Sequence, residues 1–350
     1  MDRRQTYVQI DGHATVAVKT SEGDTKVTAG RWTRAVAAMG ATAMLAVGTM
    51  APSYAIKPSG SGGTCVNYAG VPDAPAGKIP RDDVFKIGKD PIARWIAANR
   101  KRAAAAAAAD TTITVPVAFH VIRKDATLAG GNVPQSQLVQ QVAVLNNAFA
   151  DAGFRFVLRE VTRTTKAAWF HLPYTNGDGG PRYFRGSSKE IAMKRALHTG
   201  TSETLNLYSA DLGKRLLGYA WLPADFSGDN GTPLPRFYDG VVVTFQSLPG
   251  GAFTPLGYGA GDTGTHEVGH WLGLYHTFDN GCTEPGDYVD DTPAEAIPAF
   301  DCVERDTCPA PGTDPITNFM DYTADTCMDH FTAGQADRMR VQWEAYRDVD

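Results

Sequence analysis

The stretch that decides the fold is His266-Glu267-Val268-Gly269-His270-Trp271-Leu272-Gly273-Leu274-Tyr275-His276. It matches the spacing H-E-x-x-H-x-x-G-x-x-H, in which each fixed position has a chemical reason. Residues four apart on a helix share a face and lie about 6 Å apart along the axis, so His266 and His270 can bind one ion. Gly273 lets the chain leave the helix sharply, which would bring His276 back as a third ligand. Three nitrogens and one open position are typical of a catalytic zinc site.

The residue after the first histidine supplies the acid–base group. Glu267 would lie beside the metal, where it can take a proton from a zinc-bound water and pass it to the leaving amine of a peptide bond. Zinc lowers the pKa of such a water towards about 7. The pattern therefore predicts an endopeptidase acting on proteins or peptides. The histidines outside the motif are expected to be ordinary polar residues: His13, His120, His171, His198 and His330.

A second motif follows downstream, Asn318-Phe319-Met320-Asp321-Tyr322. After a zinc motif of this kind, Met320 is expected beneath the three imidazoles as an adaptable apolar floor. Tyr322 lies two residues further on and could place its phenol near the metal, where it would stabilise the developing oxyanion.

The N-terminal part of the chain predicts export. Arg31 and Arg34 precede an uncharged, Ala-rich run over residues 35–50, and Ser53-Tyr54-Ala55 places small residues where a signal peptidase reads. The run is too short for a comfortable transmembrane helix. Residues 1–55 are interpreted as a leader whose first 30 residues are either a long extension or a misassigned start. We therefore expect a secreted protein without a stable membrane anchor, and the net charge of −5 gives no indication of nucleic-acid binding.

Residues 56–110 are predicted to be a pro-segment or a plain linker. The segment opens with Lys57-Pro58-Ser59-Gly60-Ser61-Gly62-Gly63 and later carries Arg100-Lys101-Arg102, followed by seven alanines. A basic exposed triplet in such a segment suits proteolytic processing.

The catalytic domain is predicted to span residues 111–350. Strand patterns occur at 112–122, 154–158, 204–208 and 240–245, and helical spacing at 135–150. Thr332 with Gln335 forms a capping box that would start a last helix running to about Tyr346. This order of elements indicates an α+β or α/β domain.

Four cysteines cluster near the C-terminus: Cys282, Cys302, Cys308 and Cys327. In an exported chain they indicate two disulfides, for which three connectivities exist. A structural zinc site is the weaker alternative, because the cluster contains no C-x-x-C pair and no accompanying histidine.

Several of these segments together resemble the pappalysin-type metzincins, and among them the small ulilysin-like extracellular metalloproteases of bacteria and fungi. The resemblance lies in the zinc motif and in residues 286–293, 314–322 and 331–335, and it covers roughly residues 112–347. It implies an α+β metzincin fold, with a twisted sheet and two main helices in an upper lobe. The lower lobe would be rich in loops, stabilised by disulfides and followed by a C-terminal helix. The resemblance pairs Cys282 with Cys308 and Cys302 with Cys327.

The resemblance also implies calcium. It assigns the side chains of Asp287 and Thr292 and the carbonyls of Gly281 and Val289 as ligands, in a turn rich in the oxygen donors that calcium prefers. The alternative for this segment is a solvated acidic turn.

Two residues keep two interpretations each. Cys65 is either a pro-segment thiolate that holds the zinc latent, as in family members, or an incidental free thiol in a segment without the expected arginine and glycine. Asp325 either lines the pocket for the residue after the scissile bond, favouring Arg or Lys there, or is a surface residue.

Two other functions remain as alternatives to the endopeptidase. One is a zinc hydrolase of another amide, and the other is an inactive secreted binding module on the same fold.

Overall fold

The computed structural model describes residues 6–10, 14–18, 89–172, 188–212, 216–229 and 233–349. The first two ranges are strands β1 (Thr6–Ile10) and β2 (Ala14–Val18), which pair as an antiparallel hairpin. The predicted signal core at 35–50 and Cys65 lie outside the described residues. Within the described ranges, no helix is long and apolar enough to cross a membrane.

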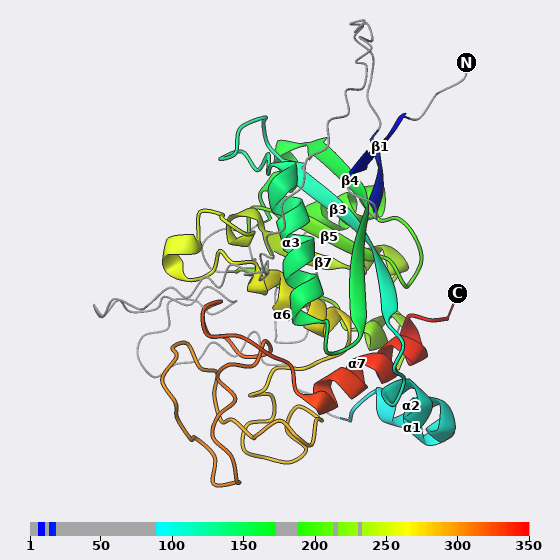
Figure 1. The fold of residues 1–350 in the computed structure, drawn as a ribbon, viewed down its shortest axis with the longest axis vertical. Helices are drawn as coiled ribbons and strands as arrows, with labels where there is room; N and C mark the ends of the chain where they lie inside the picture. The colour runs from blue at the N-terminus through cyan, green and yellow to red at the C-terminus, as the bar shows by residue number, and fades with distance from the viewer. Residues whose placement is uncertain are drawn as a thin grey trace, which may run out of the picture. The chain divides into compact units, whose positions relative to one another are not determined.

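A five-stranded sheet with the order β4-β3-β5-β7-β6 forms the frame of the larger unit (Figure 1). Its first four strands are parallel, and β6 runs antiparallel to β7 at the edge. The strands are β3 (Ile113–Arg123), β4 (Phe154–Thr165), β5 (Leu205–Ala210), β6 (Gly218–Ala220) and β7 (Val241–Thr244). The predicted strands are confirmed, although β4 continues to Thr165 because it pairs with β3 along nearly its whole length. The three residues of β6 are too few to show an alternating pattern.

Two helices cover one face of this sheet, α3 (Gln135–Ala148) and α6 (Asp262–Trp271) (Figure 1). The helical spacing read from the sequence is confirmed, because Leu138, Val142 and Leu145 on α3 are all buried in the main core. Val268 and Trp271 bring α6 into the same core. The first two histidines of the zinc motif therefore lie on a helix that is fixed by apolar packing.

The opposite face of the sheet has its own apolar cluster. Helices α4 (Ala167–Phe170) and α5 (Ser188–Leu197) contribute Phe170 and Met193, which pack with residues of β5 and β7. Short 3-10 turns occupy Pro223–Phe226, Arg236–Tyr238, Phe245–Ser247 and Thr254–Leu256.

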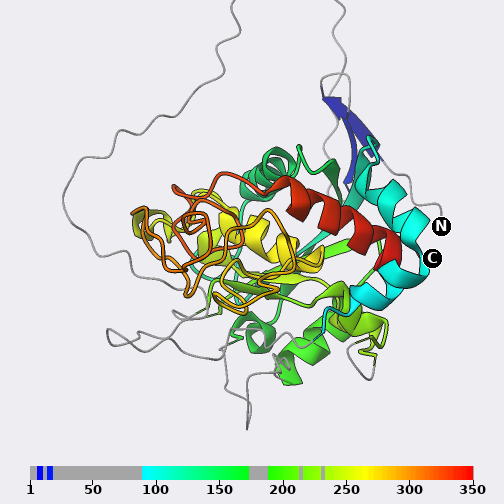
Figure 2. The same cartoon turned by 90° about the horizontal axis from the view of Figure 1, so that it is seen from below.

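The C-terminal helix α7 (Ala333–Tyr346) starts at the predicted capping box, where Thr332 accepts a hydrogen bond from the backbone N–H of Gln335. Beside it lie α1 (Ile92–Ala98) and α2 (Arg100–Ala107) (Figure 2). Ile92 and Ala103 are buried against α7. Part of the predicted pro-segment or linker therefore packs against α7, because the Ala-rich run forms a helix with a small-residue face that allows close contact.

A lobe without helices or strands connects α6 to α7. Disulfides join Cys282 to Cys308 and Cys302 to Cys327, with Cα–Cα distances of 5.3 and 5.8 Å. These are the pairs that the resemblance implied. A helix-covered sheet followed by a disulfide-linked loop region is the α+β arrangement expected of a metzincin.

Candidate active site

The exit from α6 places the third histidine. Leu274 donates a backbone hydrogen bond to the carbonyl of Gly269 at 3.0 Å, and Gly273 adopts a φ of 95°. A Cβ at Gly273 would lie 2.4 Å from the Gln342 side chain, so glycine is required by both conformation and space. The chain then turns back over the helix.

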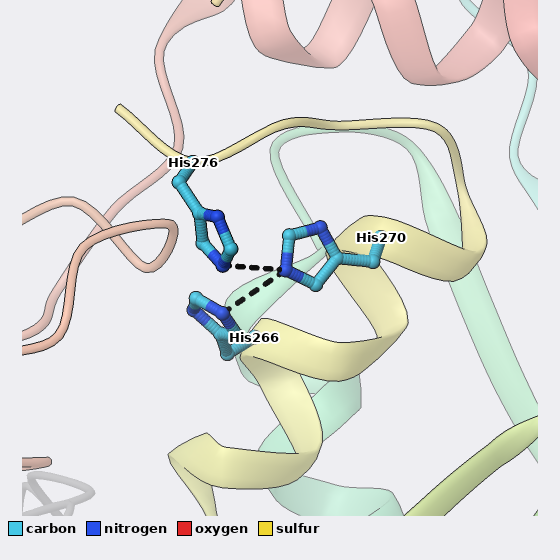
Figure 3. Close-up of side chains that lie close together, drawn as sticks. All are labelled: His266, His270 and His276. Carbon is cyan, nitrogen blue, oxygen red and sulfur yellow. Dashed lines mark hydrogen bonds between the residues drawn. The ribbon is translucent and has the colours of Figure 1, made fainter. Parts of the chain in front are cut away.

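The three histidines converge on one point (Figure 3). Nε2 of His270 lies 3.1 Å from Nε2 of His266 and 3.1 Å from Nε2 of His276. Zinc–nitrogen bonds of about 2.0–2.1 Å in a tetrahedron separate the ligand atoms by roughly 3.3 Å. The cluster thus fits one zinc ion, and it is the only group of three or more potential metal-ligating side chains found in the described ranges.

Each imidazole is oriented by its other nitrogen. Nδ1 of His266 donates to the Phe319 carbonyl at 2.7 Å, and Nδ1 of His270 donates to the Leu274 carbonyl at 2.8 Å. Nδ1 of His276 lies 3.4 Å from the buried carboxylate of Asp279, which also accepts the His276 backbone N–H. These partners leave Nε2 of each ring for the metal. Burial lowers the pKa of His266 and of His276 to about 3, so both rings are neutral ligands at physiological pH.

Glu267 lies beside this cluster, against the edge strand. A Cβ at Gly218 of β6 would be 2.6 Å from Cγ of Glu267 and 2.8 Å from its Oε1. The bare backbone of β6 therefore borders the Glu267 carboxylate. Nothing in the sequence singles out Gly218, because its importance depends on a partner 49 residues away (267 − 218).

The two residues of the downstream motif both lie close to the histidine cluster. Met320 is fully buried, and a Cβ at Gly269 would be 2.4 Å from its sulfur, so the thioether packs directly under α6 beside His270. The Tyr322 hydroxyl lies 3.1 Å from Nε2 of His276, next to the point where the three rings converge.

A pocket opens beside Glu267 and is also lined by three aspartates. It is lined by Leu217, Tyr258, Asp262, Thr263, His266, Glu267, Asp321, Tyr322, Thr323, Asp325 and Met328. Asp325 is buried and accepts the backbone N–H groups of Ala260 and Gly261, so its interpretation as a surface residue is wrong. Burial raises the pKa of Asp325 to about 6. Burial and the nearby charge of Asp325 raise the pKa of Asp262 to about 7.

The acidic turn at 286–292 contains a buried pair of oxygen atoms. Oδ2 of Asp287 and Oγ1 of Thr292 are both buried, and the Thr292 side chain lies within hydrogen-bonding reach of the Asp287 carboxylate. The other carboxylate oxygen of Asp287 accepts the Val289 backbone N–H at 3.0 Å. Burial raises the pKa of Asp287 to about 7, and the hydrogen bonds from Val289 and Thr292 and the charge of Arg338 only partly oppose this rise.

Comparison with known proteins agrees with this geometry. A family model described as Pregnancy-associated plasma protein-A, peptidase M43, matches residues 206–344. An extracellular metalloprotease of Sordaria macrospora is 43% identical over 248 residues, which cover 70% of this chain and 80% of that protein. Extracellular metalloprotease 1 of Coccidioides posadasii is 42% identical over 237 residues, which cover 67% of this chain and 78% of that protein.

Solved structures of related proteins share the fold. Mature mirolysin of Tannerella forsythia in complex with a cleaved peptide has a TM-score of 0.52 and 27% identity, over 68% of this chain and 97% of that one. A promirolysin mutant from the same organism has a TM-score of 0.54 and 27% sequence identity, over 73% of this chain and 88% of that one. The fold, the histidine cluster and these relatives together show that the chain belongs to the pappalysin-type (peptidase M43) metzincins and is a metalloendopeptidase.

Proposed function

We propose that this metalloendopeptidase is a secreted zinc enzyme in which Glu267 activates the attacking water. The observation that carries the proposal is the convergence of three Nε2 atoms beside a carboxylate that is not needed as a ligand. Zinc held by His266, His270 and His276 supplies Lewis-acid chemistry, polarising the scissile carbonyl and making water a stronger nucleophile.

Three side chains of the protein would carry out proton transfer, oxyanion stabilisation and support of the histidine rings. Glu267 accepts the proton from the attacking water and later donates it to the leaving amine. The Tyr322 hydroxyl is near enough to the cluster to donate a hydrogen bond to the developing oxyanion. Met320 provides the apolar floor that holds the rings from below.

Substrate binding is proposed along β6 and in the adjacent pocket. β6 is an edge strand in the described part of the sheet, so an extended peptide can add to it through main-chain hydrogen bonds. The pocket with Asp262 and Asp325 would accept the residue after the scissile bond and favour Arg or Lys.

Calcium is proposed as a second, structural ion. The buried oxygens of Asp287 and Thr292 support it, with the carbonyls of Gly281 and Val289 as further ligands.

We also propose that a pro-segment lies upstream of the catalytic domain and that its Cys65 keeps the zinc latent. Substituting Cys65→Ala in the full chain should then produce activity before any processing.

Cleavage of casein by the mature protein tests the main proposal. Wild type should cleave it, a zinc chelator should stop cleavage, and Glu267→Gln should lower the rate by at least about 10²-fold with zinc still bound. Equal cleavage by Glu267→Gln would refute the role of Glu267. Cleavage of a non-peptide amide but not of casein would indicate the alternative hydrolase.

A further inference from the structure

A buried ion pair behind the sheet has no part in the chemistry described above. Nζ of Lys194 lies 3.0 Å from a carboxylate oxygen of Glu190 one turn earlier on α5, and their side chains are 0% and 3% exposed. Nζ also donates to the Tyr238 carbonyl at 2.9 Å, just before β7. Burying two charges costs desolvation free energy, and a buried ion pair often adds little to stability. A role of the Glu190–Lys194 pair in function is therefore worth considering.

The pair lies over one row of the sheet. Tyr208 of β5, Val242 of β7 and Tyr219 of β6 are register partners and belong to the same apolar cluster. Nζ of Lys194 is 5.7 Å from the ring centre of Tyr208 and 5.4 Å from that of Tyr219. The two tyrosines therefore share one lysine, from opposite sides of β7.

The hydroxyl groups of Tyr219 and Tyr208 differ in their hydrogen bonding. The Tyr219 hydroxyl donates a hydrogen bond to the carboxylate of Glu190. The Tyr208 hydroxyl is buried and has no hydrogen-bond partner among the described residues. Only the edge strand is thus attached to α5 by a side-chain hydrogen bond from this row.

The residue next to Tyr219 faces the active site. Side chains alternate along a strand, so Tyr219 points to α5 while Gly218 points to α6. There the backbone of Gly218 borders the Glu267 carboxylate, close enough that an added Cβ would overlap it. β6 has only three residues and a partner strand on one side, and such short edges open easily without further support.

We propose that Tyr219 and Glu190 are positioning residues for peptide hydrolysis. The Glu190–Lys194 pair holds the Tyr219 hydroxyl and thereby holds β6 beside Glu267, where the substrate backbone is aligned. The inference rests on the proposed function, in which the substrate lies along β6. It assigns the buried pair to the enzyme's reaction rather than to stability alone.

The test compares Tyr219→Phe with Tyr208→Phe in the mature, zinc-loaded protein. Each change removes one hydroxyl beside the same lysine, but only the first breaks a hydrogen bond. We expect Tyr219→Phe to lower kcat/KM for an extended peptide about tenfold and Tyr208→Phe to stay within about twofold of wild type. Zinc content should be equal in all three proteins.

Hydrogen exchange separates positioning from a general loss of stability. Amides of residues 217–220 should exchange faster in Tyr219→Phe than in Tyr208→Phe, while those of β5 stay unchanged. Equal kcat/KM in the two variants, or a loss of activity without faster exchange in β6, would overturn the inference. If wild type itself cleaves no peptide, the proposed function fails, whereas the exchange result still reports on the contact between α5 and β6.

Discussion

The two halves of the active site are built in different ways. His266 and His270 stand on α6, which is fixed by a continuous apolar core under the sheet. His276 stands in a lobe without regular elements, where two disulfides and partly buried ion pairs replace that core. A single metal position thus joins a part stabilised by packing to a part stabilised by cross-links. The two parts should therefore respond to different perturbations.

The largest loss of folding stability is expected at a buried ion pair next to α6, in the half of the site that carries His266 and His270. The carboxylate of Asp239 forms an ion pair with Arg347 and accepts a hydrogen bond from the indole N–H of Trp271 at 3.0 Å. The side chains of Asp239 and Arg347 are both 2% exposed or less. Asp239→Ala leaves a buried guanidinium without its partner and should cost about 3–5 kcal/mol in urea unfolding. Arg102→Ala breaks the exposed pair with Glu344 and should cost less than about 1 kcal/mol. Similar costs for the two variants would contradict this account of α6.

The matching change in the lower half is removal of a cross-link. The double variant Cys302→Ser, Cys327→Ser opens a loop with a sequence separation of 25 residues and should lower the free energy of unfolding by about 2–4 kcal/mol. Limited proteolysis should then cut first between 282 and 327. Initial cleavage in the sheet instead would show that the lobes are not separately stabilised.

Sequence patterns predicted the upper half better than the lower half. The zinc helix and the core of α3 follow from local spacing, because their periodicity reflects one buried face. Asp279 and Gly218 could not be identified, since their roles depend on contacts that the fold creates. The buried position of Asp325 was missed for the same reason, because its partners Ala260 and Gly261 are loop amides far away in sequence.

Calcium removal should affect the lower half alone. At a calcium concentration of 100 times Kd, the ion adds about 2.7 kcal/mol of stability, which chelation with EGTA in zinc-buffered solution should remove. Asp287→Asn should abolish this difference. Asp290→Asn changes a neighbouring exposed acid and should preserve it. An equal calcium response in Asp287→Asn and wild type would refute the assigned site.

A smaller effect is expected where β6 meets Glu267. Gly218→Ala places a methyl group about where the Glu267 side chain now lies, so the carboxylate must move. We expect kcat to fall about 10- to 100-fold, a loss of roughly 1.4–2.7 kcal/mol, because general-base catalysis needs the carboxylate within hydrogen-bond reach. Steady-state kinetics with unchanged zinc content checks this, and an unaltered kcat would show that Glu267 has room to adjust.

The smallest effect concerns pH and the substrate pocket. Burial raises the pKa of Asp325 to about 6, so its carboxylate is charged above that pH and becomes neutral below it. The preference for Arg over Leu after the scissile bond should therefore rise with pH through about 6, by up to roughly tenfold. Asp325→Asn should remove this dependence, and a preference that is flat with pH in wild type would argue against the role.

X-ray absorption at the zinc edge tests the joining of the two halves most directly. The experiment uses zinc-loaded protein carrying Cys65→Ala, so that no thiolate from the pro-segment can bind. Three nitrogen ligands and one oxygen at about 2.0–2.1 Å, with one zinc per chain, are predicted. Substituting His276→Ala should remove one nitrogen while His266 and His270 remain. Sulfur at about 2.3 Å, or an unchanged spectrum in His276→Ala, would contradict the account.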